Sequence, residues 1–387
     1  MVQEESTKAM RLLHLADLHL GKRLHEFSLL EDQRFILNQI LEIIEAESVE
    51  GVLIAGDIYD KTVPSAEAVL LLDDFITNMA GRKIPVFLIG GNHDCVERIS
   101  FGAKLFEKSG IYLAGGYQGI VEHVMLSDAY GKLDVYLLPF IRPVHVRQAF
   151  PELADEIDSY QEAMRVVLEH IELNRERRNI LVTHQFVTGA IQSGSEEFQI
   201  GGLNQVDASL LEDFDYVALG HIHSAQWIGK ETVRYAGTPL KYSFSEAADQ
   251  KTAAIVELRE KGNIEIREIP LAPLRDLRKL RGTYEELTRR SAYENTNVED
   301  YVQITLTDET DVFDAVGKLR VIYPNLMKME YDNSRTGKEP AEAEAETERT
   351  PITYMKELFA MQNERPMSAA QERYLEKLIE TVWAETG

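Results

Sequence analysis

A short apolar run that stops at a glycine and an aspartate constrains this chain more than any other feature. Residues 52–55 (Val-Leu-Ile-Ala) are rich in strand formers, and Gly56 ends the run abruptly. So brief a run, closed by glycine, is typical of a buried strand rather than a helix. Asp57 follows directly, just past the carboxyl end of that strand, where open α/β sheets bind their ligands. We therefore expect Asp57 to lie in a ligand site, where its two carboxylate oxygens could bridge two cations.

Four other runs end in polar side chains in the same way. Residues 12–16, 86–89, 180–183 and 216–219 are short and mostly apolar, and each predicts a strand. The polar residues that follow these runs are Asp17 and His19, then Asn92, His93 and Asp94, then His184, and finally His221 and His223. Carboxylate and amide oxygens bind hard cations, whereas imidazole suits first-row transition metals. This mixed set predicts a site for ions of the Mn, Fe or Zn class rather than a calcium site or a structural zinc held by thiolates.

The spacing within two of these motifs supports a shared site. Side chains two positions apart on an extended chain project to the same side. Asp17 and His19 have this spacing, as do His221 and His223. We therefore expect each pair to point in one direction. Five of the ten histidines, among them His14 inside a predicted strand, lack such a context and are given no role at the ligand site.

Composition and charge limit the class of protein. A chain of 387 residues, 44% hydrophobic and 27% charged, is expected to form two or three globular domains. No apolar run approaches the roughly 20 residues that span a bilayer, and the polar, acidic start does not resemble a signal peptide. The single cysteine, Cys95, excludes an internal disulfide and is interpreted as a packing residue. Together these features predict a cytoplasmic protein.

The formal net charge of −24 argues against a simple nucleic-acid binder. Affinity for a phosphate backbone normally comes from a basic surface. Two bound divalent ions would add local positive charge where a phosphate must lie, without changing the global balance. By charge alone, a small-molecule enzyme is favoured. The acidic remainder leaves room for a second, more basic subunit.

Strands and helices alternate from residue 10 to residue 270, the pattern of an α/β domain. The helices expected to cover its sheet are at residues 31–46, 64–80, 97–108 and 156–176. Farther along, residues 301–306 and 326–331 predict strands on either side of a helix. Residues 271–331 are therefore expected to form a small separate α+β unit.

The two ends of the chain and one internal segment differ in composition from these domains. Residues 1–9 predict a disordered extension, and residues 332–349, with five glutamates from 339 to 348, predict an acidic flexible linker. Residues 350–387 predict a helical pair, with Ser368 in a capping box at the start of the second helix. So short a segment cannot build a core alone. It must dock on the body of its own chain or on a partner, and a partner is modestly favoured.

The motifs Asp17-x-His19, Gly56-Asp57-x-x-Asp60, Gly91-Asn92-His93-Asp94, His184 and Gly220-His221-x-His223 resemble those of the calcineurin-like metallophosphoesterase superfamily. Within it, residues 17–22 and the C-terminal organisation resemble the SbcD nuclease subunits of bacterial SbcC–SbcD DNA repair complexes. The resemblance spans roughly residues 10–387, and Leu18 departs from a tryptophan common at its position. It implies two stacked sheets flanked by helices for residues 10–270 and a DNA-capping domain for residues 271–331.

The resemblance also implies roles for the motif residues. One ion would be held by Asp17, His19 and His223, the other by Asn92, His184 and His221, with Asp57 bridging the two. His93 would be catalytic, protonating the leaving oxygen or stabilising the transition state. Asp60 and Asp94 would hold hydrogen bonds around the ligands. Lys22, Arg23 and His25 are candidates for contact with DNA, although a solvated loop is an equally good interpretation of their sequence alone.

The implied function is that of a DNA exonuclease and endonuclease, which hydrolyses phosphodiesters with two divalent ions. Mn²⁺ is the ion expected. The enzyme would act with an SbcC-like coiled-coil ATPase in double-strand break and hairpin processing, and so in DNA repair, recombination and replication. Residues 350–387 would bind the base of the partner's coiled coil. Residues 64–80 and 97–108 would form a two-fold dimer contact. A homodimer of this chain that binds the ATPase would then be a heterotetramer.

Two alternatives remain open at this stage. A phosphatase or cyclic-nucleotide phosphodiesterase could use the same scaffold, but the units after residue 270 favour the nuclease. A scaffold subunit with a lapsed metal site is disfavoured because every motif ligand is present. Tyr59 stands one position too early to match the tyrosine ligand of purple acid phosphatases, which argues against an iron–tyrosinate centre.

Overall fold

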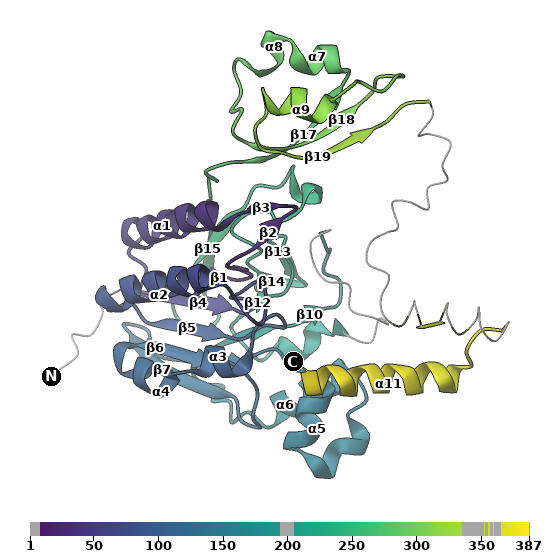
Figure 1. Ribbon diagram of the computed structural model, residues 1–387. Coiled ribbons are helices and arrows are strands. Elements are labelled where there is room, and N and C mark those ends of the chain that lie inside the picture. Colours follow the sequence, from purple (N-terminus) through teal and green to yellow (C-terminus); the bar gives the residue numbers. More distant parts are fainter. Residues whose placement is uncertain are drawn as a thin grey trace.

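Two six-stranded sheets lie face to face in the larger part of the chain (Figure 1). The computed structural model describes residues 8–193, 205–334 and 365–386, together with residues 352, 355, 356 and 359. In the order of the first sheet, the strands are β16 (Ile264–Pro270), β15 (Thr252–Leu258), β1 (Met10–Leu15), β4 (Gly51–Ala55), β5 (Val86–Ile89) and β6 (Ile111–Ala114). Strands β1, β4, β5 and β6 are parallel, so their carboxyl ends lie along one edge.

The second sheet repeats this arrangement with antiparallel strands at both edges. In order, its strands are β13 (Gln226–Ile228), β14 (Lys230–Tyr235), β12 (Tyr216–Gly220), β9 (Arg178–His184), β8 (Gly131–Leu138) and β7 (Glu122–Asp128). Strands β14, β12, β9 and β8 are parallel, whereas β13 and β7 run antiparallel to their neighbours. The carboxyl ends of β9 and β12 are therefore also brought to one edge.

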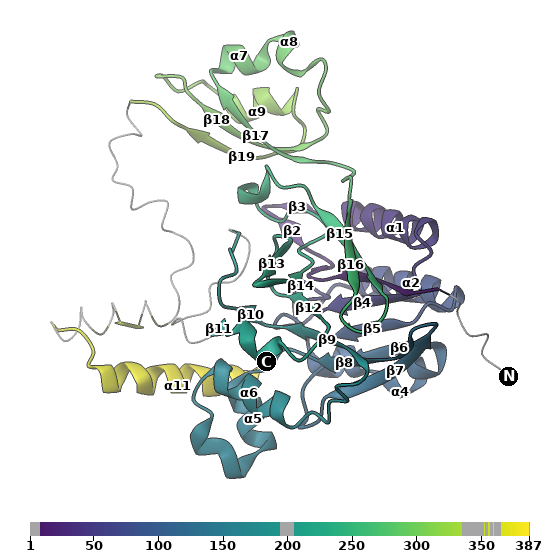
Figure 2. The same ribbon diagram turned by 180° about the vertical axis from the view of Figure 1, so that it is seen from behind.

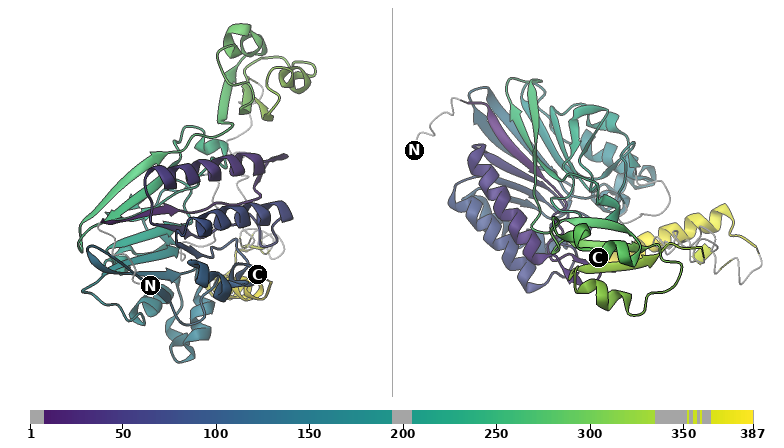
Figure 3. Two further views of the ribbon diagram at one scale, coloured as in Figure 1. Left: turned by 90° about the vertical axis from the view of Figure 1, so that its left-hand side faces the viewer. Right: turned by 90° about the horizontal axis from the view of Figure 1, so that it is seen from above.

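Helices cover the outer faces of both sheets (Figures 2 and 3). Helices α1 (Leu30–Ala46) and α2 (Ala66–Gly81) pack on the first sheet, and α5 (Pro143–Ala149) and α6 (Tyr160–Glu169) pack on the second. Apolar side chains from both sheets fill the layer between them. Because both of its faces are covered, β4 is buried at every position, which explains why it is an uninterrupted apolar run. This is the two-sheet sandwich that the resemblance implied.

Two predicted helices differ from the structure. The helix expected at 97–108 is broken into α3 (Val96–Ser100), α4 (Ala103–Phe106) and a 3-10 turn, because Gly102 adopts a left-handed conformation with φ of 75°. The helix expected at 156–176 is only α6, and its start is marked by the Ser159 side chain, which accepts a hydrogen bond from the Glu162 amide. Apolar periodicity continues beyond both helices, and it misled the prediction of their ends.

A small sheet with its own core follows the sandwich, drawn in green at the top of Figure 1. Its parallel strands are β17 (Leu277–Gly282), β18 (Tyr301–Leu306) and β19 (Leu326–Tyr331), joined through α7 (Tyr284–Thr288), α8 (Arg290–Tyr293) and α9 (Ala315–Arg320). The strands predicted at 301–306 and 326–331 are confirmed. The boundary predicted near residue 270 falls at the end of β16.

A junction around Asp32 connects the small sheet to the sandwich. Leu277 and Tyr301 belong to the core under α1, and the Tyr301 hydroxyl donates to Asp32 Oδ2 over 2.8 Å. Arg275 donates to the same oxygen over 3.0 Å. A cavity of about 330 Å³ lies at this junction, lined in part by Asp32, Arg275 and Tyr301. The small unit is thus attached by buried polar contacts as well as by the chain itself.

The last helix, α11 (Ala369–Thr386), lies beside α5 (Figure 1). Its predicted capping box is confirmed, because Ser368 Oγ accepts from the Gln371 amide and Gln371 Oε1 accepts from the Ser368 amide. Residues 1–7 of the predicted extension, 335–349 of the predicted linker and most of the first predicted C-terminal helix lie outside the described residues. Within the described part of the chain, no helix has the length and apolar composition needed to cross a bilayer.

Candidate metal centre

The predicted ligand loops meet at the carboxyl ends of the parallel strands. The loops after β1 and β4 are joined by main-chain hydrogen bonds from Asp17 to Gly56 (3.0 Å) and from His19 to Asp57 (2.9 Å). The loop after β12 is attached to them as well, because the His221 amide donates to the Asp17 carboxylate over 3.0 Å. Residues from both sheets therefore share one site.

The backbone of this site is strained at the ligands themselves. Asp17, His19, Asp57 and His221 have φ values of 52°, 43°, 50° and 103°, a region that favours glycine. Such outliers cost about 1–3 kcal/mol each and cluster at functional sites. The side chains therefore converge through turns. The premise that each pair lies on an extended chain was therefore wrong, although Asp17 and His19 do meet in one ligand group.

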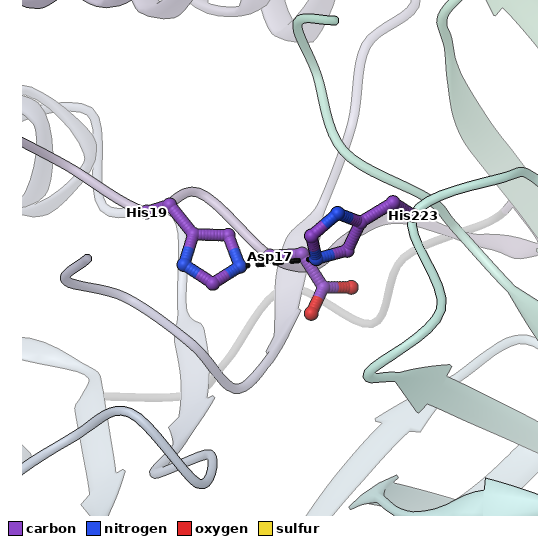
Figure 4. A group of neighbouring side chains, drawn as sticks. All are labelled: Asp17, His19 and His223. Atoms are coloured by element: carbon purple, nitrogen blue, oxygen red, sulfur yellow. Dashed lines mark hydrogen bonds between the residues drawn. The ribbon is translucent and has the colours of Figure 1, made fainter. Parts of the chain in front are cut away.

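One ligand group contains Asp17, His19 and His223 (Figure 4). Ligand atoms of these three buried residues all lie within 4.8 Å of one another. The two imidazoles face each other, with 3.2 Å between their Nε2 atoms. Two ligands of one ion are about this far apart when each lies roughly 2.1 Å from it. The group is thus spaced to share one cation.

A second group contains Asn92, His184 and His221. The amide oxygen of Asn92 lies 3.0 Å from His184 Nε2 and 3.0 Å from His221 Nδ1. Asp57 stands between the two groups, with Oδ2 3.4 Å from His184 Nε2 and 3.7 Å from His19 Nε2. A carboxylate in that position can contact ions in both groups.

The hydrogen-bond pattern of His184 leaves a place for a cation. Its Nδ1 lies 2.8 Å from the carbonyl oxygen of Ala55, which can only accept, so Nδ1 carries the hydrogen. In the neutral ring, Nε2 then directs a lone pair toward two further acceptors, Asn92 Oδ1 and Asp57 Oδ2. Burial lowers the pKa of His184, but the carboxylates of Asp57 and Asp17 outweigh it and raise the pKa to about 9. The same negative charge would stabilise a bound metal ion.

The other imidazoles are poised for metal binding. Burial lowers the pKa of His221 to about 3, and it also lowers the pKa of His19 and of His223 well below the usual value. Burial opposes ionisation of Asp57, yet the neighbouring histidines, His184 first, bring its pKa well below the usual range. An ionised carboxylate among neutral imidazoles is the state in which these groups bind metals. The donor set fits two divalent ions.

Two glycines allow the loops to pack this closely. A Cβ on Gly91 would lie 2.1 Å from Asp57 Oδ1, and a Cβ on Gly56 would lie 2.4 Å from His184 Nδ1. Gly56 also has a φ of 85°, which other residues rarely adopt. Any side chain at either position would push a ligand out of place.

His93 lies beside both ligand groups and is half-buried. Its amide donates to Asp57 Oδ1 over 3.0 Å, and its Nδ1 lies 3.2 Å from the carbonyl oxygen of Asp60. Its Nε2 is 3.9 Å from Asp57 Oδ2, and its ring is edge-on to that of His19, with 4.9 Å between centroids. The ring is thus held with Nε2 toward the site, and it also lies within reach of a metal ion.

The two further aspartates are bonded to the loops. Asp94 accepts main-chain hydrogen bonds from Ile58, Tyr59 and Gly91, and burial together with the charge of Asp57 raises its pKa to about 6. Asp60 pairs with Lys22 over 2.8 Å. Both carboxylates fix the shape of the loops that carry Asp57 and Asn92.

The candidates for DNA contact lie on a hairpin next to the site. Lys22 is occupied by Asp60, and the guanidinium of Arg23, in β2 (Arg23–Leu24), bonds the carbonyl of Glu26. His25 is exposed, and its ring lies 6.0 Å from that of Phe244. Only Arg23 and His25 therefore present substantial exposed surface.

Three residues that touch the site have no signal in the sequence. Phe140 packs on the rings of His184 and His221, at centroid distances of 6.1 and 6.4 Å. Gln33 and Tyr242 contact the loop of His19. Phe140 follows an ordinary apolar run, and Gln33 lies inside a helical pattern, so neither stands out without the structure.

A largely buried set of Asp, Asn and His side chains, at the strand ends of a two-sheet sandwich, is typical of a metal-dependent phosphoesterase. The profile of the calcineurin-like phosphoesterase family matches residues 10–225. A second profile, described as the type 5 capsule protein repressor C-terminal domain, matches residues 273–363.

Relatives sharpen this assignment. The SbcD subunit of nuclease SbcCD from Staphylococcus epidermidis is 35% identical over 325 residues, which cover 83% of this chain and 85% of that protein. The same subunit from Staphylococcus saprophyticus is 36% identical over 324 residues, covering 83% and 84%. The chain belongs to the SbcD family of calcineurin-like phosphoesterases. The family resemblance, the fold class and the enzyme class predicted from the sequence are thereby confirmed.

Two solved structures are more distantly similar. A dimetal phosphatase from Danio rerio has a TM-score of 0.41 and 11% identity, covering 69% of this chain and 99% of its own. A protein of Thermus thermophilus has a TM-score of 0.39 and 10% identity, covering 67% and 99%.

Proposed function

We propose that this chain is the nuclease subunit of a DNA-processing complex, which hydrolyses phosphodiesters with two divalent metal ions. The observation that carries this proposal is the position of Asp57 between two ligand groups, within 3.7 Å of an imidazole from each. The names of its relatives, which are subunits of the SbcCD nuclease, supply the substrate class.

Each ion would have its own ligands and share one. Asp17, His19 and His223 would hold the first, Asn92, His184 and His221 the second, and Asp57 both. When bound, the pair would clamp the phosphodiester and lower the pKa of a water molecule enough for it to attack phosphorus near neutral pH. Mixed nitrogen and oxygen ligands suit Mn²⁺, which is the ion we propose.

The protein's own proton chemistry would come from His93. The carbonyl of Asp60 holds the hydrogen on Nδ1, so Nε2 is the atom that points toward the phosphate. A proton on Nε2 could be given to the leaving sugar oxygen, or its charge could stabilise the transition state. The amide of His93 also donates to Asp57, which keeps the ring aligned with the ligands.

DNA would lie across the metal centre beneath the small sheet, with residues 271–331 as a capping domain. Strand β17 is an edge strand with exposed Lys279 and Arg281, and the exposed Arg23 and His25 lie near the metals. These cations are few for a chain with a net charge of −24. We therefore propose that the metal ions and a more basic partner supply much of the affinity.

The partner proposed is an SbcC-like coiled-coil ATPase, bound through residues 350–387. Helix α11 exposes Tyr374 and Leu378 although it lies beside α5, so part of its apolar surface is left uncovered by the described residues. A homodimer is proposed through the exposed Leu70 of α2 with Phe101 and Leu105 near α4, and a heterotetramer follows. Cytoplasmic localisation and roles in break and hairpin processing belong to the same proposal.

The deciding experiment compares DNA and a small ester. The full chain is assayed with Mn²⁺ on linear duplex and hairpin DNA, with and without the ATPase partner, and on bis-p-nitrophenyl phosphate. Cleavage of DNA that depends on Mn²⁺ and is absent in Asp57→Asn is expected. Cleavage of the small ester alone would instead identify a phosphatase or cyclic-nucleotide phosphodiesterase.

A further inference from the structure

We propose that Gln33 and Tyr242 are positioning residues for the first metal ion, which hold the imidazoles of His19 and His223 before the ion binds. The inference rests on the proposed two-metal function. It concerns how the ligands are placed and assigns no new ligand.

The side-chain amide of Gln33 forms hydrogen bonds with the turn that carries the ligand His19. It lies in the first turn of α1 and is 1% exposed. Its Oε1 accepts from the Gly21 amide over 2.9 Å, and its Nε2 donates to the His19 carbonyl over 2.7 Å. The same Nε2 lies 3.3 Å from the Leu18 carbonyl and 3.1 Å from the Tyr242 hydroxyl. Both donors and the acceptor of the amide are thus used to fix this turn.

Tyr242 completes the support from the other side. It is 2% exposed, and its hydroxyl donates to the Leu18 carbonyl over 2.5 Å. Its ring is edge-on to both imidazoles of the first ligand group, with centroids 5.7 Å from His19 and 6.4 Å from His223. One aromatic ring therefore sets the distance between two ligands that come from opposite sheets.

The turn needs this support because its backbone is strained. Asp17 and His19 both have positive φ, and strained residues persist only where surrounding contacts over-determine them. One of the two Nε2 atoms, 3.2 Å apart, donates a hydrogen bond to the other, and a shared ion would take the place of that hydrogen. Without Gln33 and Tyr242 the loop would relax. Binding of the ion would then have to reorder it, at a cost in affinity.

This role predicts a selective loss of metal affinity. Residues that orient metal ligands without touching the metal typically contribute about 10–100-fold to affinity. Gln33 and Tyr242 contact the group of His19 and His223, whereas His184 of the second group is hydrogen-bonded to the Ala55 carbonyl. Only one of the two ions should therefore bind more weakly in their variants.

The test is calorimetric titration of the full-length chain with Mn²⁺, for wild type, Gln33→Met and Tyr242→Phe. Tyr216→Phe is the matched control, since it also removes a buried hydroxyl, one bonded to His14 Nδ1 over 2.9 Å at the far end of β12. We expect two ions in every protein, one of them bound about 10–100-fold more weakly in both test variants and neither weakened in the control. Nuclease kcat should recover at high Mn²⁺ with KM for DNA unchanged.

Several results would overturn the inference. Wild-type affinity for both ions in Tyr242→Phe, with circular dichroism showing a folded chain, removes the role of its hydroxyl. Equal weakening of both ions, or the same loss in Tyr216→Phe, would show a general structural effect. If wild type binds two ions and cleaves DNA but the test variants titrate like it, only this inference fails. If wild type binds no pair of ions, the proposed function fails with it.

Discussion

Aspartates follow the carboxyl ends of parallel strands both in the metal centre and in the small sheet, yet the surroundings of these carboxylates differ. In the metal centre, Asp57 has a 3% exposed side chain and lies within 4 Å of three imidazoles. In the small sheet, Asp308 accepts from the Tyr284 amide over 2.7 Å, and Asp332, with a 54% exposed side chain, pairs with Arg281. Strand ends alone therefore do not make a metal site.

The difference lies in what satisfies the negative charge. Asp308 is hydrogen-bonded and Asp332 is ion-paired within the protein, so a cation would gain little there. Asp57 and Asp17 are buried among imidazoles, whose ring nitrogens are common ligands of transition metals. Strained backbone conformations hold these groups together. The metal centre thus brings buried carboxylates and imidazole nitrogens together within one small volume, and this is what suits it to cations.

Removing the central charge should have the largest effect. Asp57→Asn keeps the shape but loses the charge shared by both ligand groups, so kcat should fall by about 10³-fold or more. Hydrolysis of bis-p-nitrophenyl phosphate with Mn²⁺ measures this. Asp332→Asn is the matched control and should stay within about twofold, because it changes a surface pair. A fall in kcat of less than tenfold in Asp57→Asn would contradict the contrast drawn between the metal centre and the small sheet.

The next largest effect should come from His93. His93→Ala is expected to keep two Mn²⁺ ions while losing about 10²–10³-fold in kcat, as removal of a general acid typically does. Activity and metal content are measured on the same sample. If the variant instead loses an ion, His93 is a ligand, as its position within reach of His19 and Asp57 would allow.

Acid should weaken the sandwich through those buried histidines whose pKa is lowered, all of which precede residue 224. Burial, and then the charge of Arg234, lower the pKa of His14 to about 3, against 6.5 in the unfolded chain. The unfolded state therefore binds the extra proton as pH falls below 6.5, and stability is lost at about 1.4 kcal/mol per pH unit for this group. Urea unfolding in EDTA at pH 7 and 5.5 should show that the free energy of unfolding falls less between these pH values for His14→Gln than for wild type. Equal losses would remove His14 from the explanation.

The smallest effect should come from the junction between the two regions. Tyr301→Phe removes the hydrogen bond to Asp32, which should cost about 1 kcal/mol in the free energy of unfolding. Tyr323→Phe is the control, since it removes a similar bond to Leu287 inside the small sheet. Protease cleavage near residue 273 should increase in the first variant and not in the second. Equal cleavage would show that the bond does not fix the small sheet.

The sequence was most informative where burial is complete. Strands β4, β5, β9 and β12 are covered on both faces, so each appears as an apolar run that stops at a ligand. The positive φ of His19 and His221 could not be predicted, because tertiary contacts impose it on residues that do not favour it. Gln33 was hidden for the same reason. Its role depends on hydrogen bonds to Gly21, which lies outside α1, and to Tyr242, which is remote in the chain.

The most direct test is an anomalous difference map from a crystal of the full-length chain soaked in Mn²⁺. We expect two peaks about 3.5–4 Å apart, one beside His19 and His223, the other beside Asn92 and His184, with the Asp57 carboxylate touching both. A single peak, or strong peaks only outside these two groups, would contradict the two-metal site.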